Sequence, residues 1–435
     1  MTKARLSRNF HLLWAGETAG QVGDRVTQLV IPAVMVFILG ASAFEVGLVS
    51  MAQYVAIPVL SLVAGALVDR WDLRRLLIAC DLVRFGAVAI IPVAYWRGFL
   101  SVPLLFACVA VVSVATVFFS LGYIPALSSI VDTKDLVRAN ARLEGSRTVS
   151  EVGGPALAGW LYQLFGVVAL LVDALSYLLS AATFRAMRPF RVQAASSQRI
   201  RARLATGIRM NWTDPILRRS TAGTFLANIG GPIFVTQLPV LAYRGLHLSA
   251  GEFGTVMSIA ALGAVLGAVV APGLARRMGS GRMLALSMVA HSASGLGILA
   301  VPRYPAAIVL CLTLTLYGFF FSWYNINSQS IRQARVPISD QAVIHGAYRT
   351  VTWGVIPISV FIGGWIVTAL DGRMDILDAA RYTMLAATVI GISSIVPLAG
   401  MQRLLDTARP IEDAPPPAPQ PLGPVVPEVG LVDTR

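Results

Sequence analysis

Long apolar stretches recur along the whole chain and are separated by short polar segments. A helix needs about 20 residues, at 1.5 Å each, to cross the roughly 30 Å of hydrocarbon in a bilayer. The pattern therefore predicts an all-α integral membrane protein with an even number of spans, so that both ends of the chain lie on the same side. We expect twelve transmembrane helices, near residues 12–38, 46–68, 76–96, 102–123, 143–164, 167–187, 220–243, 252–274, 283–301, 305–329, 346–369 and 380–403.

The basic residues predict the orientation of these helices. Of the 435 residues 56% are hydrophobic and only 13% are charged, yet the net charge is +13. Most Lys and Arg side chains lie in the N-terminus, in alternate loops and in the tail, and basic residues of short loops remain cytoplasmic. We therefore expect both termini in the cytoplasm of a bacterium, with the protein in its cytoplasmic (inner) membrane. This dispersal along one membrane face argues against nucleic-acid binding.

The two halves of the chain resemble each other. At an offset of 207 residues Ser42, Glu45 and Gly47 meet Ser249, Glu252 and Gly254, and at an offset of 202 the triplets "FFS" and "RTV" recur. Parallel repeats of this kind are typical of transporters whose substrate site lies between the halves near the midplane. The predicted units are an N-terminal six-helix bundle (1–187), a basic cytoplasmic linker (188–219), a C-terminal six-helix bundle (220–404) and a disordered Pro-rich cytoplasmic tail (405–435).

The segment "GALVDRWDLRR", between the second and third spans, resembles the G-x-L-x-D-R-x-G-R-R signature of the major facilitator superfamily. Asp72 stands where the signature has glycine and Leu73 where it has a base. The resemblance implies two pseudo-symmetric six-helix bundles and a gate that holds their cytoplasmic ends together, next to the start of span eleven near His345. The gating residues would be Gly65, Asp69, Arg70 and Arg74, with Asp81 and Arg84 extending the charge network. A plain topology-setting basic loop is the alternative.

Other segments are similar to the drug- and siderophore-exporting branch of that superfamily, which includes proton-coupled multidrug and enterobactin exporters. They are "NFHLLWAGETAGQVGDR", "DLVRANARL", "GGPALAGW" and "LLVDALSYLLSA". Gly154, Pro155 and Gly159 are similar to the motif that antiporters carry in span five. The branch implies export of a small organic molecule by alternating access, driven by the proton gradient and without a cofactor.

The first span carries acidic residues at unusual depth. Span seven, its partner in the repeat, is uncharged from Thr221 to Ala242, and this window maps to 14–35 and places Asp24 about halfway along its helix. The spacing i, i+4, i+7, i+11 places Glu17, Gln21, Asp24 and Gln28 on one face. Because an acid at the bilayer centre is costly, this face must line a central cavity.

There Asp24 could couple transport to protons or another cation, bind a cationic substrate, or serve only as a structural partner for an arginine. Glu17, which lies closer to the cytoplasmic end, is a further proton-coupling candidate.

Arg25 points away from Asp24 and needs another partner. Asp173 and Glu151 are the candidates, and both are also candidates for proton coupling. Glu144, Arg147 and Glu151 have helical spacing and can pair with one another.

In span ten, the aromatic and amide-rich run "YGFFFSWYNINSQS" offers Tyr324 and Asn325 as substrate contacts, beside the cavity residues Gln21, Arg25 and Gln28. Helix packing or an interfacial aromatic belt is the alternative for this run.

No motif points to an enzyme. The four histidines are scattered, and the chain has no H-E-x-x-H, no G-x-S-x-G, no nucleotide-binding loop and no metal-ligand spacing among its three cysteines. We therefore expect a monomeric secondary transporter whose partners are a small molecule, protons and the lipid bilayer. An importer or symporter of the same superfamily and a non-transporting membrane sensor remain the alternatives.

Overall fold

The computed structural model describes residues 7–68, 71–131, 135–187, 209–301, 303–336 and 338–407, apart from the side chains of 61–68, 137 and 338–343. Residues 188–208 of the predicted linker (188–219) and the predicted Pro-rich tail from 408 onward lie outside these residues. The described chain is almost entirely helical and contains no strand. The computed structure therefore confirms the predicted all-α class.

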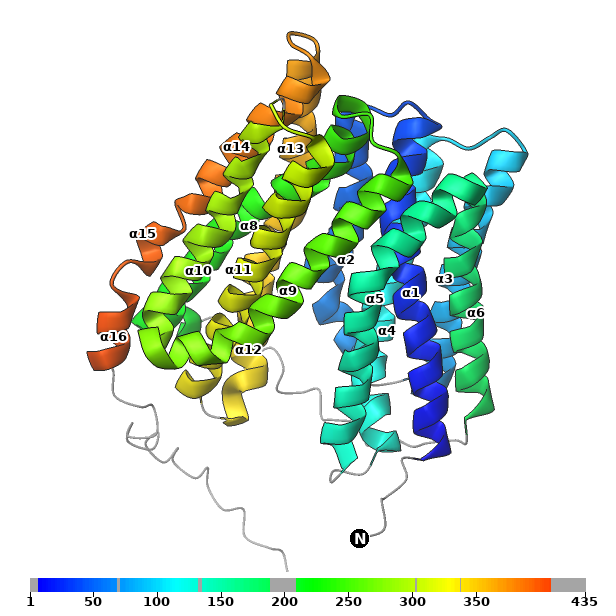
Figure 1. The fold of residues 1–435 in the computed structure, drawn as a ribbon. Coiled ribbons are helices and arrows are strands. Elements are labelled where there is room, and N and C mark those ends of the chain that lie inside the picture. Colours follow the sequence, from blue (N-terminus) through cyan, green and yellow to red (C-terminus); the bar gives the residue numbers. More distant parts are fainter. Residues whose placement is uncertain are drawn as a thin grey trace, which may run out of the picture.

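The first half of the chain forms a bundle of helices, shown in blue to blue-green in Figure 1. Its helices are α1 (Arg8–Phe37), α2 (Ala43–Val68), α3 (Leu73–Trp96), α4 (Val102–Ile130), α5 (Leu136–Phe165), the short 3₁₀ helix η2 (Gly166–Ala169) and α6 (Leu170–Ala186).

The second half repeats this arrangement with more interruptions. Its elements are α8 (Pro215–Val240), the π-helical turn η4 (Leu241–Gly245), α9 (Ala250–Met278), α10 (Ser280–Ser294), the 3₁₀ helix η5 (Gly295–Ala300), α11 (Ala306–Arg335), α12 (Ile338–Gly354), α13 (Ile356–Asp371), α14 (Ile376–Ile392), α15 (Ile395–Leu398) and α16 (Met401–Thr407).

Ten helical segments of the described chain are long and apolar enough to cross a membrane. One of them, Arg138–Ala186, contains both α5 and α6, which η2 separates. The α1 helix is missing from the ten because Glu17, Asp24 and Arg25 interrupt its apolar sequence. When α5 and α6 are counted apart and α1 is included, the described chain has the twelve predicted spans.

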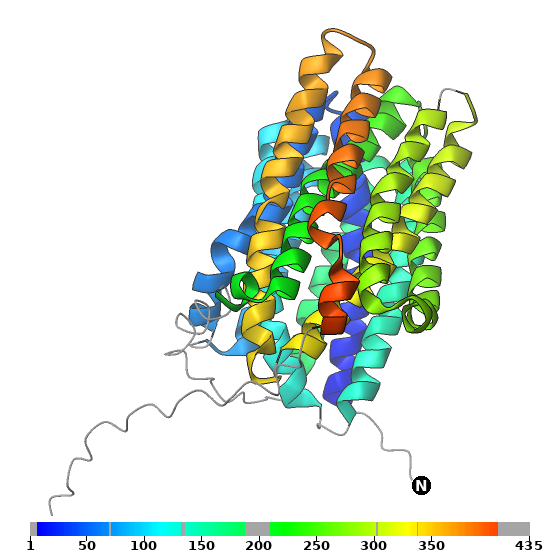
Figure 2. The same ribbon diagram turned by 90° about the vertical axis from the view of Figure 1, so that its left-hand side faces the viewer.

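The two halves lie side by side, and in Figure 1 helices of the second half such as α9 and α10 slant away from those of the first half toward the end where α1 begins (Figures 1 and 2). They meet along two seams, α5 against α9 and α2 against α13. These four helices hold corresponding places in the two copies of the repeat, so the seams are related by the same pseudo-symmetry.

The repeated Ser and Glu residues have a structural reason, because they begin the second helix of each half. The Ser42 and Ser249 backbone N–H groups donate to Glu45 and Glu252 at 2.8 Å, and the Glu N–H groups donate back to the serine hydroxyls. Each pair is a capping box, which satisfies two backbone donors that have no partner within the helix. The repeat is thus visible in the helix starts as well as in the sequence.

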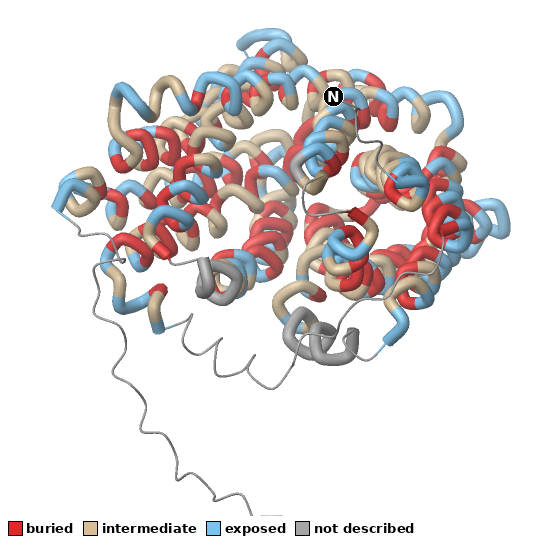
Figure 3. Tube along the Cα trace, turned by 90° about the horizontal axis from the view of Figure 1, so that it is seen from below, coloured by how far each residue is buried: buried red, intermediate tan, exposed pale blue. Residues whose placement is uncertain are grey.

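Large apolar side chains are exposed on the outer faces of the bundle, as expected for contact with lipid. Leu164, Val269 and Val396 are each more than 70% exposed. Viewed from the N-terminal end, the buried positions lie mainly where helices face one another (Figure 3). Apart from the cavity described next, the burial pattern is therefore that of a membrane protein with a packed interior.

Candidate functional site

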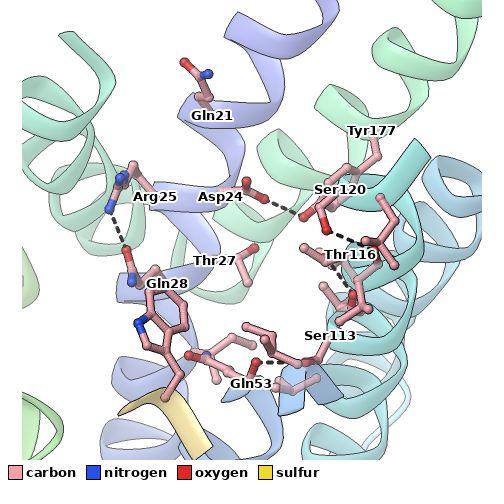
Figure 4. Close-up of a pocket in the computed structure, with 18 of the residues that line it drawn as sticks. Gln21, Asp24, Arg25, Thr27, Gln28, Gln53, Ser113, Thr116, Ser120 and Tyr177 are labelled. Carbon is pink, nitrogen blue, oxygen red and sulfur yellow. Dashed lines mark hydrogen bonds between the residues drawn. The ribbon is translucent and has the colours of Figure 1, made fainter. Parts of the chain in front are cut away.

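A cavity of about 840 Å³ lies between the two halves. Most of its wall comes from α1, α2 and α4, and α12 supplies the part that belongs to the second half (Figure 4). Its lining combines charged, amide and hydroxyl groups with aliphatic side chains. Such a mixed lining suits an amphipathic organic molecule. The polar lining residues are Glu17, Gln21, Asp24, Arg25, Thr27, Gln28, Gln53, Ser113, Thr116, Ser120, Arg147, Ser150, Tyr177, Arg349 and Thr350.

The halves are held together at only one end of this cavity among the described residues. We call the end where α1 begins the N-terminal end, and the end that carries the Gly40 loop the opposite end (Figure 1). The hydrogen bonds between the halves of the described chain lie toward the opposite end, and they join Phe44 to Thr368, Ala156 to Ser258, Trp160 to Thr255 and Gly251 to Gln163. The rings of Phe37 and Tyr243 also meet there, with their centroids 4.7 Å apart.

The polar face of α1 lines the cavity as the spacing predicted. Glu17, Gln21, Asp24 and Gln28 are all part of the wall, and the Gln21 amide lies 3.3 Å from the Glu17 carboxylate. Behind this face, Gly16 and Gly23 allow α6 to approach so closely that a Cβ on either would collide with α6 atoms. The small residues of α1 thus fix the helix against α6 and turn its polar face to the cavity.

Asp24 belongs to a charged network that the sequence did not reveal. The Tyr177 hydroxyl of α6 donates a 2.6 Å hydrogen bond to Asp24 Oδ1 (Figure 4). The Arg84 guanidinium lies between the rings of Tyr177 and Phe119, at 4.7 and 4.1 Å from their centroids. Its Nη2 is 2.5 Å from Asp81 Oδ1 in a pair that is almost fully buried. An acid that is open to the cavity is thereby connected, through Tyr177, to a buried ion pair.

This network places Asp81 and Arg84 inside the first half, and their predicted part in extending the gate stays a prediction, because Asp69 and Arg70 lie outside the described residues. Arg84 lies eleven residues after the start of α3, which is about 16 Å along the helix at 1.5 Å per residue. Its side chain points to α4 and α6, because Phe119 and Tyr177 offer their ring faces there. The pair therefore belongs to the interior of the first half and contacts Tyr177 beside the cavity wall.

Asp173 lies on α6, facing α1, and is fully buried. Its carboxylate accepts hydrogen bonds from the hydroxyls of Thr27 and Ser176. It is neither part of the cavity wall nor the partner of Arg25. The structure thus gives Asp173 a packing contact between α1 and α6, and its predicted part in coupling stays a prediction.

Arg25 pairs with Glu151 of α5, which decides between the two acids that the sequence offered. Arg25 Nη2 is 2.9 Å from Glu151 Oε1, and its Nη1 donates to Gln28 at 3.0 Å (Figure 4). The same Glu151 oxygen accepts a 3.1 Å bond from Arg147, which is also 3.8 Å from Glu144. The predicted pairing among these α5 residues is therefore confirmed.

The antiporter-like motif lies where α5 meets its neighbours. Gly154 makes room for the Arg25 side chain, since a Cβ there would come 2.7 Å from Arg25 Cβ. At Gly159 the α5 backbone touches α9, and a Cβ would collide with the Ala250 carbonyl oxygen. Pro155 packs its carbonyl against Gly254, and the following N–H donates to Ser258 at 2.8 Å. Pro155 and Gly159 of the motif thus lie in one of the two seams between the halves, and Gly154 packs against α1.

Only some of the predicted gating residues belong to the described chain. Gly65 lies near the end of α2, and Asp69 and Arg70 lie outside the described residues. Arg74 donates to the backbone carbonyls of Phe184 and Arg185 at the end of α6, where a cation stabilises the helix dipole. Within the described chain Arg74 therefore binds its own half and has no hydrogen bond to α12 near His345.

Tyr324 and Asn325 of α11 do not line the cavity. The Tyr324 hydroxyl is buried against those of Thr224 and Tyr348 inside the second half, and Asn325 is exposed. The second half contacts the cavity instead through α12, with Gly346, Arg349, Thr350 and Trp353. A role of Tyr324 or Asn325 in substrate binding stays a prediction, without support from the cavity lining.

The described residues contain no cluster of His, Cys, Asp and Glu that could hold a metal ion. The sequence matches the profile of the Major Facilitator Superfamily over residues 13–360. It is 24% identical over 413 residues to the multidrug efflux pump Tap of Mycolicibacterium fortuitum, covering 90% of this chain and 97% of the relative.

Identity to the staphyloferrin A transporter of Staphylococcus aureus is 23% over 332 residues, covering 74% of this chain and 79% of that protein. The crystal structure of the nucleoside transporter NupG superposes with a TM-score of 0.71, covering 90% of this chain and all of the other at 13% identity. This likeness shows the shared fold.

The match over most of the chain and the twelve helices in two similar halves lead to the same result. The chain is a multi-pass membrane transporter, and not an enzyme, that belongs to the major facilitator superfamily.

Proposed function

We propose that this protein exports a small amphipathic organic molecule in exchange for protons, by alternating access. The observation that carries the proposal is Asp24, a carboxylate open to a mixed polar and apolar cavity that the halves close at one end. Placing an acid inside a membrane costs free energy, so an acid found there is a candidate for binding or ion transfer.

The positions of the basic residues orient this cavity. Arg8, Arg74, Arg75, Arg276 and Arg277 lie toward the N-terminal end of the cavity, and the positive-inside rule favours a cytoplasmic position for that end. The closed opposite end then faces the outside. In this orientation the described conformation receives substrate from the cytoplasm of a bacterial cell through its inner membrane.

Asp24 lines the cavity in which the substrate would bind, so its protonation can be coupled to substrate transport. A charged Asp24 is stabilised by the Tyr177 hydroxyl and is available to a substrate that enters from the cytoplasm. After the halves rock about their seams, Asp24 faces the outside and takes up a proton from the more acidic medium, and the substrate leaves to that side. The protonated carboxylate returns and releases the proton inside, which completes one exchange.

Two features favour export over import. Pro155 and Gly159 lie in the seam between α5 and α9, and together with Gly154 they are similar to the motif of antiporters. Two relatives carry names that describe efflux of drugs and transport of a siderophore. An exporter of an organic molecule fits both the motif and the cavity lining.

Transport into everted membrane vesicles tests the proposal, because their cytoplasmic face is outside. Ethidium and fluorescein serve as a cationic and an anionic probe. We expect the protein to accumulate at least one of them when the vesicle interior is acidic, and nigericin, which collapses the pH gradient, should abolish the accumulation. Accumulation that requires an alkaline interior would indicate proton-coupled import, and no accumulation of either probe would contradict the proposal.

A further inference from the structure

The α12 helix presents one polar and aromatic face to the cavity. Gly346, Arg349, Thr350 and Trp353 are spaced i, i+3, i+4 and i+7, so they lie along a single side of the helix. The Arg349 guanidinium is 4.6 Å from the centroid of the Trp353 ring, and both side chains are exposed. This face is the contribution of the second half to the cavity wall.

Arg349 differs from the other arginines of the wall because its charge is not balanced. Arg25 and Arg147 both bind Glu151, at 2.9 and 3.1 Å. Among the described residues no carboxylate forms an ion pair with Arg349, and the acids that line the cavity, Glu17 and Asp24, belong to α1. An exposed guanidinium inside a membrane protein is then available to a mobile anion.

The surroundings of Arg349 add to the positive charge. Both Arg349 and the buried Arg332 are close enough to influence His345 electrostatically. Arg332 contacts the Ser328 hydroxyl at 2.5 Å and the Tyr348 ring at 3.8 Å, and so finds no acid in the described chain either. Positive charges on this side of the cavity attract ions of the opposite sign.

We infer that Arg349 binds an anionic group of the transported molecule, a carboxylate or phenolate, and that Trp353 packs against its aromatic or apolar body. A guanidinium presents its N–H groups in a planar fork that matches a carboxylate, and an indole ring gives a flat apolar surface. The inference rests on the proposed function and names its substrate class, an amphipathic organic anion or a zwitterion.

Binding to the purified full-length protein tests this assignment without a proton gradient. Fluorescein is the anionic aromatic probe and ethidium the cationic one, and fluorescence polarisation gives both affinities. We expect Arg349→Gln to weaken fluorescein binding about tenfold or more, as loss of a charged hydrogen bond predicts, and to leave ethidium binding within about twofold. Arg349→Lys should keep part of the affinity, since it retains the charge without the planar fork.

The matched control is Arg303→Gln, which removes the same charge from an exposed loop position outside the cavity. Wild-type binding of fluorescein should also weaken with salt, and Arg349→Gln should lose this dependence. A wild-type protein that does not bind fluorescein overturns the inference, and so does an Arg349→Gln variant that binds it normally. Equal loss of both probes overturns it as well, because Arg349 would then shape the cavity without selecting an anion.

These outcomes are separate from those of the proposed function. A protein that binds fluorescein through Arg349 but transports neither probe contradicts export and leaves the anion site standing. A protein that exports ethidium with full dependence on the gradient, and whose binding ignores Arg349, contradicts the anion site alone.

Discussion

Tyr177→Phe removes one hydroxyl group from beside Asp24 and keeps the ring that lies under Arg84. The lost bond is 2.6 Å long, its donor is buried and its acceptor is a carboxylate. A hydrogen bond to a charged group contributes about 1.5–3 kcal/mol, which corresponds to a factor of about ten or more in an equilibrium constant. Because this bond holds the Asp24 carboxylate in the cavity wall, the variant should lower gradient-driven transport about tenfold or more.

The assay is gradient-driven transport in proteoliposomes, measured at a constant pH difference. Tyr162→Phe is the matched control, because among the described residues the Tyr162 hydroxyl makes only a 3.5 Å contact with the Ala33 carbonyl and has no hydrogen bond to an acid. A Tyr177→Phe rate that equals the rate of the control would refute the role assigned to the contact between Tyr177 and Asp24.

Two further predictions concern the contacts around α5. Gly159→Val should reduce transport strongly, because its side chain would meet the Ala250 carbonyl in the seam, whereas Gly153→Val, at a position with no neighbour within 4 Å, should leave the transport rate near wild type. Arg25→Gln should lower the stability of the purified protein by about 1 kcal/mol, since its ion pair with Glu151 is partly exposed, and thermal unfolding would show a lower midpoint.

The helices could be predicted from the sequence because their signals are local. Span length and apolar runs locate the membrane helices other than α1, and the spacing of Glu17, Gln21, Asp24 and Gln28 identifies the face of α1 that lines the cavity. The repeat predicts that Asp24 lies about halfway along its helix, and the paired capping boxes show that the repeat reflects helix geometry. Local spacing thus accounts for the wall that α1 contributes.

The partners across helices could not be predicted, since spacing on one helix does not tell which neighbour faces it. Tyr177 lies in an apolar run where an aromatic residue suggests packing, and its contact with Asp24 depends on the close approach of α1 and α6. The sequence allowed Arg25 to pair with either Asp173 or Glu151. In the structure Gly154 leaves room for the Arg25 side chain, which pairs with Glu151.

The sequence pointed to α11, whereas α12 supplies the second half's part of the cavity wall, and the reason is similar. The aromatic and amide groups of α11 form a conspicuous sequence pattern, but the Tyr324 hydroxyl is taken up by Thr224 and Tyr348. Arg349 and Trp353 lie near the predicted start of a span, where basic and aromatic residues are common. The sequence therefore does not identify them as cavity residues. Only the packing of α12 beside α2 brings them to the cavity.

The most direct test of the account compares two modes of transport by Asp24→Asn in proteoliposomes. An amide of the same size cannot take up and release a proton, but it preserves the shape of the cavity. We predict that the variant loses accumulation driven by the pH gradient and keeps exchange of labelled for unlabelled substrate at equal pH. Full gradient-driven accumulation by Asp24→Asn would contradict the claim that this residue couples export to protons.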